Sequence, residues 1–206
     1  MNVARILYPV KVLGPGSRIG IWLAGCPRRC VGCSNPELWE KQPRYEVPVE
    51  RLVQMIAPLW TNRDASGFTI TGGDPLWQAD ELSTFLKRIA GWTDDILVYT
   101  GYTKEELDSL KNPAVRSCLE HIGVLIDEPY VESKNNGTRM RGSSNQNIFI
   151  LKKALAKRYE DYLATGRNEI QNFMTRDGMV SVGIHRPGFQ RQIVLEAEKK
   201  GVILHE

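Results

Sequence analysis

Short, nearly continuous apolar runs alternate with amphipathic segments between residues 19 and 127. Such runs are typical of strands buried on both faces, and those at 19–24, 68–71, 96–100 and 124–127 are predicted to be strands. Apolar residues recur at helical spacing in 49–57, 80–90 and 104–110, and the first of these helices is expected to stop near Pro58. Strands separated by helices predict an α/β fold with a parallel sheet.

The pattern changes after Asn147. Residues 148–163 are predicted to form a helix whose solvated side carries Lys152, Lys153, Lys157 and Arg158. Two apolar segments, 171–174 and 179–184, then flank an Asp-Gly pair that favours a hairpin, and a final helix over 190–200 is expected to end at Gly201. We therefore predict a core domain of residues 1–167 and a small hairpin-plus-helix appendage of residues 168–206.

Length and charge narrow the class of protein. The chain has 206 residues, about one domain, and its 42% apolar and 25% charged residues are ordinary for a globular protein. A net charge of +3 does not favour nucleic acid as a partner. Uncharged stretches fall well short of the ~20 residues that cross a bilayer, and the N-terminus lacks an apolar block with a cleavage site. We therefore expect a cytoplasmic protein without a membrane span.

Three of the four cysteines lie within eight consecutive residues. Cys26, Cys30 and Cys33 form a C-x3-C-x2-C run, whereas Cys118 is isolated. Thiolates are ligands of iron–sulfur clusters and of structural zinc, but a closed zinc site needs a fourth ligand, and the three histidines are scattered. Three cysteines therefore favour a 4Fe-4S cluster with one iron open to an outside ligand. A zinc site or plain buried thiols are the alternatives.

A second motif follows the next predicted strand. Residues 69–76 place Gly72, Gly73 and Asp74 just past its end. Ligands gather at the carboxyl ends of parallel strands, and glycines let a ligand approach the backbone closely. Asp74 could accept a hydrogen bond from an ammonium group. By itself such a string is more often a simple turn. It indicates a ligand site here because it follows the cysteine loop by one strand–helix unit.

The chain resembles the radical S-adenosylmethionine (SAM) enzymes in six motifs that occur in the family's order. Within that superfamily it is similar to the branch that activates anaerobic ribonucleotide reductase. The motifs are the segments 14–16, 25–39, 71–76, 98–107, 124–131 and 141–146.

This resemblance implies an incomplete parallel βα-barrel of the radical SAM type with its cavity at the strands' carboxyl ends. Cys26, Cys30 and Cys33 would hold one 4Fe-4S cluster, and SAM would chelate its fourth iron. One electron from the reduced cluster would break the C5′–S bond of SAM, and the resulting 5′-deoxyadenosyl radical would take a hydrogen atom from a glycine of a partner enzyme. The implied partners are this glycyl radical enzyme and a flavodoxin- or ferredoxin-type electron donor.

The resemblance also implies cofactor-binding roles for six other residues. Gly72, Gly73 and Asp74 would bind the methionine amino end of SAM. Gly32 and Ser34 would lie near the nucleoside, and Asp127 would lie near the ribose. For Asp127, a capping or turn role before Pro129 is the alternative.

Two departures from the family pattern leave other functions open. Ser34 stands where this branch usually has an aromatic residue, and the appendage is extra. The radical chemistry could therefore act on a peptide, a tRNA base or a small metabolite. A non-catalytic iron–sulfur electron carrier is a third hypothesis, although such a protein needs no Gly-Gly-Asp-Pro site. Arg28 and Arg29 could tune the reduction potential of the cluster or dock an acidic electron donor. The alternative is that they are solvated loop charges.

Overall fold

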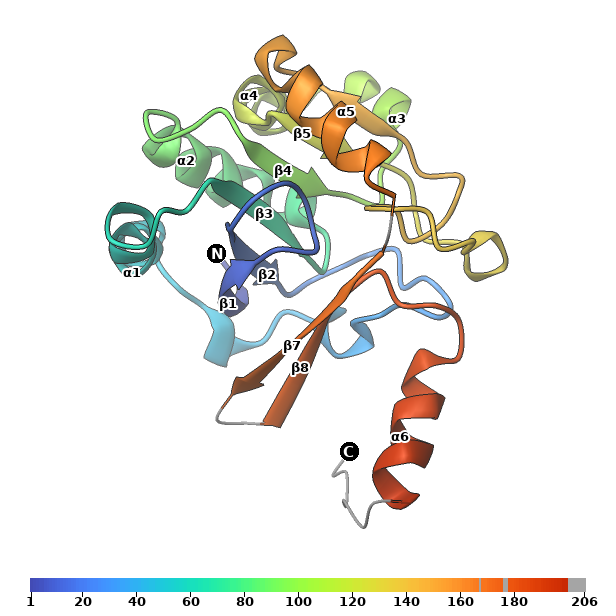
Figure 1. The fold of residues 1–206 in the computed structure, drawn as a ribbon. Coiled ribbons are helices and arrows are strands. Elements are labelled where there is room, and N and C mark those ends of the chain that lie inside the picture. The colour runs from blue at the N-terminus through green and yellow to red at the C-terminus, as the bar shows by residue number, and fades with distance from the viewer. Residues whose placement is uncertain (167, 176–177, 200–206) are drawn as a thin grey trace.

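The computed structural model describes residues 1–166, 168–175 and 178–199. Within this part of the chain, a sheet of six strands runs in the order β1 to β6 (Figure 1). Strands β2 to β5 are parallel, and β1 and β6 pair antiparallel at the two edges. The strands are β1 (Val3–Val10), β2 (Arg18–Leu23), β3 (Gly67–Gly72), β4 (Ile96–Tyr99), β5 (Val124–Ile126) and β6 (Ile148–Ile150). This arrangement confirms an α/β fold with a mostly parallel sheet.

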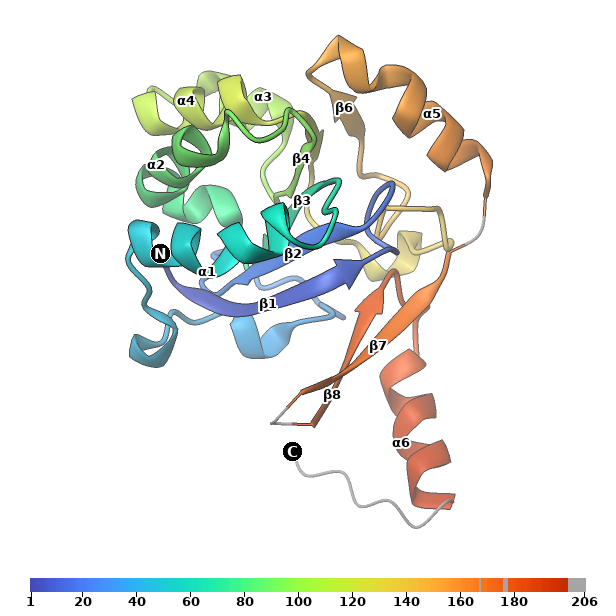
Figure 2. The same ribbon diagram turned by 60° about the vertical axis from the view of Figure 1, so that its left-hand side comes forward.

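Three of the helices in the described residues pack on one face of the sheet (Figure 2). The α-helices among the described residues are α1 (Val49–Thr61), α2 (Ala79–Ile89), α3 (Lys104–Ser109), α4 (Pro113–His121), α5 (Ala156–Ala164) and α6 (Phe189–Lys199). Apolar residues of α1, α2 and α4 pack in one core with Ile21, Phe68, Ile70 and Val98. Because side chains alternate along a strand, Trp22, Thr71 and Tyr99 point to the opposite face. Part of that face is covered in turn, because Tyr159 of α5 shares a core with Leu97, Val124 and Ile126.

A two-stranded hairpin packs on the β1–β2 edge of the sheet. It consists of β7 (Ile170–Thr175) and β8 (Gly178–Gly183), and α6 follows it (Figure 1). Val182 is only 3% exposed and shares a core with Leu7, Val10 and Trp22. The predicted hairpin and final helix are thus present. Asp177 of the predicted turn and Gly201 at the predicted helix end lie outside the described residues, and the domain boundary at 167/168 stays a prediction.

The predicted and observed elements agree closely in the middle of the chain. The four predicted strands match β2 to β5 to within one residue at each end. The predicted set lacks β1, so the cysteine loop follows the second strand and not the first. Two register shifts interrupt the pairing of β1 with β2, and such bulges disturb the period-2 pattern by which a strand is recognised.

Two predicted helices are wrong in extent. Helix α1 continues past Pro58 to Thr61, because proline there removes only the bond to the carbonyl of Gln54, an exposed residue. The helix predicted over 148–163 is instead β6 followed by α5, since Ile148, Phe149 and Ile150 pair with β5. Arg158 is exposed, as predicted, but its Nη1 also lies 3.3 Å from a carboxylate oxygen of buried Asp95.

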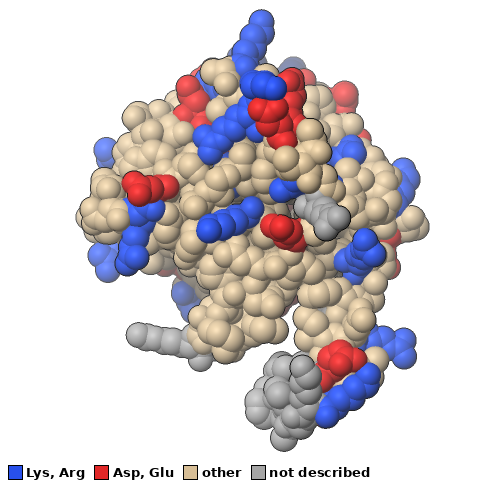
Figure 3. All heavy atoms as spheres, viewed as in Figure 1, with Lys and Arg blue, Asp and Glu red and all other residues tan. Residues whose placement is uncertain are grey.

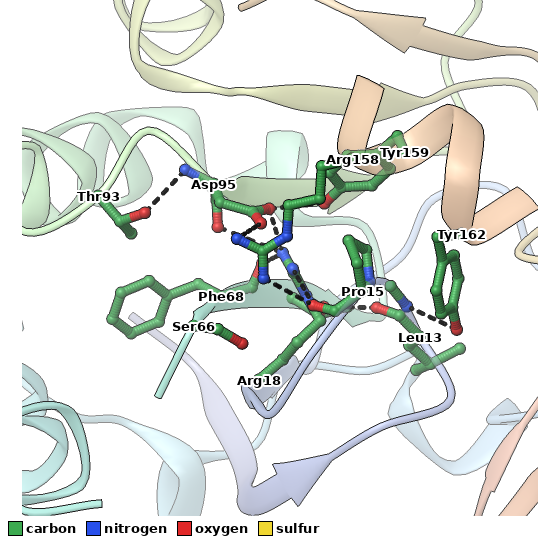
Figure 4. Close-up of polar contacts among 12 residues, drawn as sticks. Leu13, Pro15, Arg18, Ser66, Phe68, Thr93, Asp95, Arg158, Tyr159 and Tyr162 are labelled. Atoms are coloured by element: carbon green, nitrogen blue, oxygen red, sulfur yellow. Dashed lines mark hydrogen bonds and ion pairs between the residues drawn. The ribbon is translucent and has the colours of Figure 1, made fainter. Parts of the chain in front are cut away.

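A buried ionic network joins the amino ends of the parallel strands (Figure 4). Arg18, the first residue of β2, is fully buried and its Nη2 donates to Asp95 Oδ1 at 2.9 Å. Its other N–H groups donate to Thr69 Oγ1, the Phe68 carbonyl and the Pro15 carbonyl. Tyr159 of α5 donates its hydroxyl to the same Asp95 oxygen at 2.6 Å. The network therefore ties β2, β3, the start of β4 and α5 together at the end of the sheet remote from the cysteines.

None of the helices in the described ranges is long and apolar enough to cross a membrane.

Candidate functional site

The cysteine loop leaves the carboxyl end of β2 and is held in place by backbone hydrogen bonds. The Gly25 and Cys26 N–H groups each donate at 2.8 Å, to the carbonyls of Leu38 and Trp39. Further along, the Cys33 N–H donates to the Cys30 carbonyl at 3.2 Å. These bonds fold the segment between residues 25 and 39 back on itself.

The predicted glycine turn is bonded directly to the start of this loop. The Gly73 N–H donates to the Leu23 carbonyl at 2.6 Å, and the Asp74 N–H donates to the Gly25 carbonyl at 2.8 Å. A Cβ on Gly73 would lie 2.5 Å from the Gly25 oxygen, and Gly72 has a φ of +103°. Only glycine therefore fits this contact without displacing the backbone. The structure brings the two motifs together as the parallel topology predicts.

The two motifs line one cavity of about 190 Å³. Its wall includes all three clustered cysteines, Ser34, Gly72 and Gly73. Cys26, Cys30 and Cys33 are half-buried free thiols, whereas Cys118 is fully buried elsewhere. The cavity lies at the carboxyl ends of the parallel strands, where ligands bind in open α/β sheets.

The thiols of the loop have a mixed environment. Burial raises the pKa of Cys26 and of Cys30. Backbone N–H groups oppose this rise: Arg28 and Arg29 donate toward the Cys26 sulfur, and Tyr130 donates toward the Cys30 sulfur. The Asn35 N–H lies 3.4 Å from the Cys33 sulfur. Amide donors of this kind stabilise charged sulfur ligands and tune cluster potentials.

These residues fit an iron–sulfur cluster better than a single metal ion. In the part of the chain that the structure describes, no three His, Cys, Asp or Glu side chains converge closely enough to hold one ion. A 4Fe-4S cluster does not require the sulfurs to converge on one point, because each thiolate binds a different iron and the sulfurs surround the cluster. Three thiols around one cavity, each near backbone N–H donors, satisfy that requirement.

Asp74 is a buried carboxylate that holds the glycine turn in place through hydrogen bonds. It is 1% exposed and caps the short 3₁₀ helix Pro75–Gln78 by accepting from the Leu76 N–H at 3.0 Å. The Thr100 hydroxyl and the Gly101 N–H both donate to it at 2.9 Å. Burial raises the pKa of its carboxyl despite these donors. Asp74 thus links the ends of β3 and β4, and its role toward an ammonium group stays a prediction.

Gly32 and Asp127 lie outside the cavity lining, unlike Ser34. Gly32 has a φ of +72°, and a Cβ there would meet the Glu132 side chain at 2.7 Å. The Asp127 carboxylate accepts from the Lys104 N–H at 2.9 Å and from the Asn147 backbone N–H at 3.0 Å. Its contacts within the chain therefore match the capping alternative, and its role near a ribose stays a prediction.

Arg28 and Arg29 are both paired with acidic side chains. Arg28 contacts Glu106 and lies over the Tyr102 ring, 4.6 Å from its centroid, and Arg29 contacts Glu40. Basic and acidic side chains are also interspersed over the face of the molecule drawn in Figure 3. The loop arginines thus brace the cysteine loop against α3 and against the segment after Trp39. Their role toward an electron donor stays a prediction.

Sequence reasoning gave no site role to several residues of the cavity wall, although some of them lie in the motif segments 98–107 and 124–131. Thr100 and Gly101 follow β4 directly, so the rule that ligands meet strand carboxyl ends could have found them. Tyr130 comes from the loop after β5, and residues 181–185 come from the end of β8 and just beyond it. No local signal marks the last group, because only the docking of the hairpin brings it to the cavity.

Most of the chain is similar in sequence to known proteins. Residues 12–149 match the family model described as a 4Fe-4S single cluster domain. The anaerobic ribonucleoside-triphosphate reductase-activating protein of Vibrio cholerae is 34% identical over 149 residues, which are 68% of this chain and 93% of that protein. The chain belongs to this family of activating proteins.

Other relatives extend the family. The protein of the same name from Salmonella typhimurium is 33% identical over 152 residues, covering 70% of this chain and 96% of that protein. The pyruvate formate-lyase-activating enzyme of Staphylococcus epidermidis is 38% identical over 79 residues, which are 37% of this chain and 32% of that enzyme. The reductase-activating proteins therefore match far more of the chain.

Gly73→Ala tests the contact between the two motifs. The added methyl group would collide with the Gly25 backbone, so we expect the free energy of unfolding to fall by about 1–3 kcal/mol in urea. Gly91→Ala is the matched control, because a Cβ there meets no atom within 4 Å. Equal stability of the two variants would show that the cysteine loop does not pack on the glycine turn.

Proposed function

We propose that the protein is a radical SAM activase that installs a glycyl radical on an anaerobic ribonucleotide reductase. The observation that carries this proposal is the single cavity shared by the three cysteines and the Gly72-Gly73 turn. Membership of the reductase-activating family supports the reaction, and the closer match to these proteins favours ribonucleotide reductase over pyruvate formate-lyase as the partner.

The chain's own residues have separate tasks in this proposal. Cys26, Cys30 and Cys33 would hold the 4Fe-4S cluster. Gly72 and Gly73 line the cavity where SAM would lie, and Asp74 holds their turn against β4 through Thr100. When bound, the cluster and SAM together supply one-electron reductive cleavage and a radical able to remove a glycine hydrogen. The protein would position these groups against each other.

An incomplete βα-barrel is the fold that we propose for this chemistry. Strands β2 to β5 lie side by side in the order in which they occur along the chain. An open, doubly wound sheet instead binds its ligand where the strand order reverses, and these four strands have no such reversal. Helices α1, α2 and α4 pack on one side, and Trp22, Thr71 and Tyr99 face the cavity on the other. An open barrel leaves a mouth that a loop of a large partner can enter. We further propose a cytoplasmic location and a flavodoxin- or ferredoxin-type electron donor.

The proposed function is tested by anaerobic reconstitution. We expect the reduced, reconstituted protein to form 5′-deoxyadenosine from SAM, and to produce a glycyl radical signal in electron paramagnetic resonance (EPR) spectra of its genome's anaerobic ribonucleotide reductase. Omitting SAM is the control. Failure to form 5′-deoxyadenosine with a fully loaded cluster would overturn the enzymatic proposal. Product formation without a radical in the partner would favour another substrate.

A further inference from the structure

The hairpin β7–β8 supplies part of the wall of the cysteine cavity. Residues 181–185 line that cavity together with the three cysteines. The family model ends at residue 149, and the 149–154 matched residues already cover 93–96% of three reductase-activating relatives. The hairpin wall therefore lies outside the part of the chain that matches the family model.

Residues near the start of β7 and the end of β8, which lie side by side, fix the hairpin to the core. The Gln171 side-chain amide donates to the Pro9 carbonyl of β1 at 2.7 Å. It accepts from the N–H of Lys11, just after β1, at 3.0 Å. Val182 is buried against the sheet, and Asn135 donates to the His185 carbonyl at 2.8 Å. These contacts hold the end of β8 at the cavity, so its side chains have defined positions there.

Ser181 and His185 form a hydrogen-bonded pair on this wall. The Ser181 Oγ lies 3.0 Å from the His185 Nε2, and the imidazole stacks on Phe189 with ring centroids 4.2 Å apart. Burial lowers the pKa of His185, which favours the neutral ring. In either tautomer, the pair keeps a polar hydrogen and a lone pair for a further partner. A peptide group, with one N–H and one carbonyl, matches that combination.

The remaining surface of the hairpin favours a protein over a small metabolite as the occupant. Met174 is 82% exposed, Met179 is 49% exposed, and Ile170 is 41% exposed. Flexible methionines are common on surfaces that bind other proteins. A partner loop that enters the cavity would bring the partner's surface onto these side chains, whereas a small molecule in the cavity would not reach them.

We propose that Ser181 and His185 position the partner's glycine-bearing loop by hydrogen bonding to its peptide backbone. This inference rests on the proposed function and adds to it a substrate subsite supplied by the hairpin. Ser181 and His185 are positioning residues: they set where the target glycine lies relative to the cysteines and transfer no electron or hydrogen themselves.

Substitutions that keep the shape of the pair provide the kinetic test. Ser181→Ala removes the hydroxyl, and His185→Phe keeps a ring that can stack on Phe189. With the cognate reductase as the varied substrate, we expect each change to raise its KM roughly three- to tenfold, with kcat falling less than KM rises. Ser181→Thr restores the hydroxyl and should restore KM. His121→Phe, on α4 away from the cavity, is the matched control.

Hydrogen exchange on the unmodified chain gives an independent test. Adding the reductase should protect the backbone amides of residues 178–185, while those of α2 exchange as before. An unchanged KM in both variants, or no added protection of 178–185, would overturn the inference. The proposed function fails by a different result, namely no 5′-deoxyadenosine from the wild-type protein, so the two failures are distinguishable.

Discussion

Replacing Cys26, Cys30 or Cys33 with alanine is expected to abolish the visible absorbance of the reconstituted protein and its formation of 5′-deoxyadenosine. Each thiol lines the same cavity, and a cluster that already has only three cysteine ligands cannot lose one and remain bound. Absorbance, iron and sulfide content per chain, and 5′-deoxyadenosine measured on the same samples would check this result.

Cys118→Ala is the control for these variants. The Cys118 side chain is fully buried under α2, with its sulfur 3.4 Å from the Ala79 carbonyl, and burial raises its pKa to about 12. It therefore stays a protonated, inert thiol, and its loss should leave the cluster in place. A full cluster in any of the three loop variants would contradict the ligand assignment.

Asp95→Asn is expected to cost about 3–5 kcal/mol of unfolding free energy, because it leaves the Arg18 charge buried without its counter-ion. Both side chains are almost completely inaccessible, and the Arg18 N–H groups have no route to water. The same change weakens the contacts of Tyr159 and Arg158, through which α5 is attached to the sheet. Denaturant unfolding followed by circular dichroism would measure the loss.

A surface ion pair provides the comparison for this variant. Lys157 and Asp161 pair along α5, but their side chains are 82% and 61% exposed. Exposed pairs contribute little to stability. The unfolding free energy of Lys157→Ala should therefore equal that of the wild type within experimental error. A loss below about 1 kcal/mol for Asp95→Asn would mean that the buried pair is not a main link between α5 and the sheet.

The local chemistry of the site could be predicted from the sequence. The spacing of Cys26, Cys30 and Cys33 is visible in the chain, and so is the position of Gly72 and Gly73 one strand later. Parallel strands bring their carboxyl ends to one edge, which is why these two motifs were expected to meet. The strands themselves were predicted to within one residue because buried parallel strands are nearly continuous apolar runs.

Features that depend on pairing between distant segments could not be predicted in this way. Residues 148–150 have an apolar pattern that suits a helix or a strand, and only the free edge of β5 makes them a strand. Arg158 looks like one of several solvated cations, and its contact with Asp95 exists because α5 packs over the amino ends of the strands. Both are long-range effects with no local signal.

The sequence by itself therefore determined the α/β class, the cysteine ligand set expected for a cluster, and the glycine turn beside it. These follow from periodicity and spacing, which are local properties of the chain. Only the tertiary structure decided that Asp74 supports the turn from behind, that Arg28 is paired with Glu106, and that Ser181 and His185 reach the cavity. The physical reason is that side-chain partners and cavity walls depend on which segments pack together, and segments distant in the sequence meet only in the folded chain.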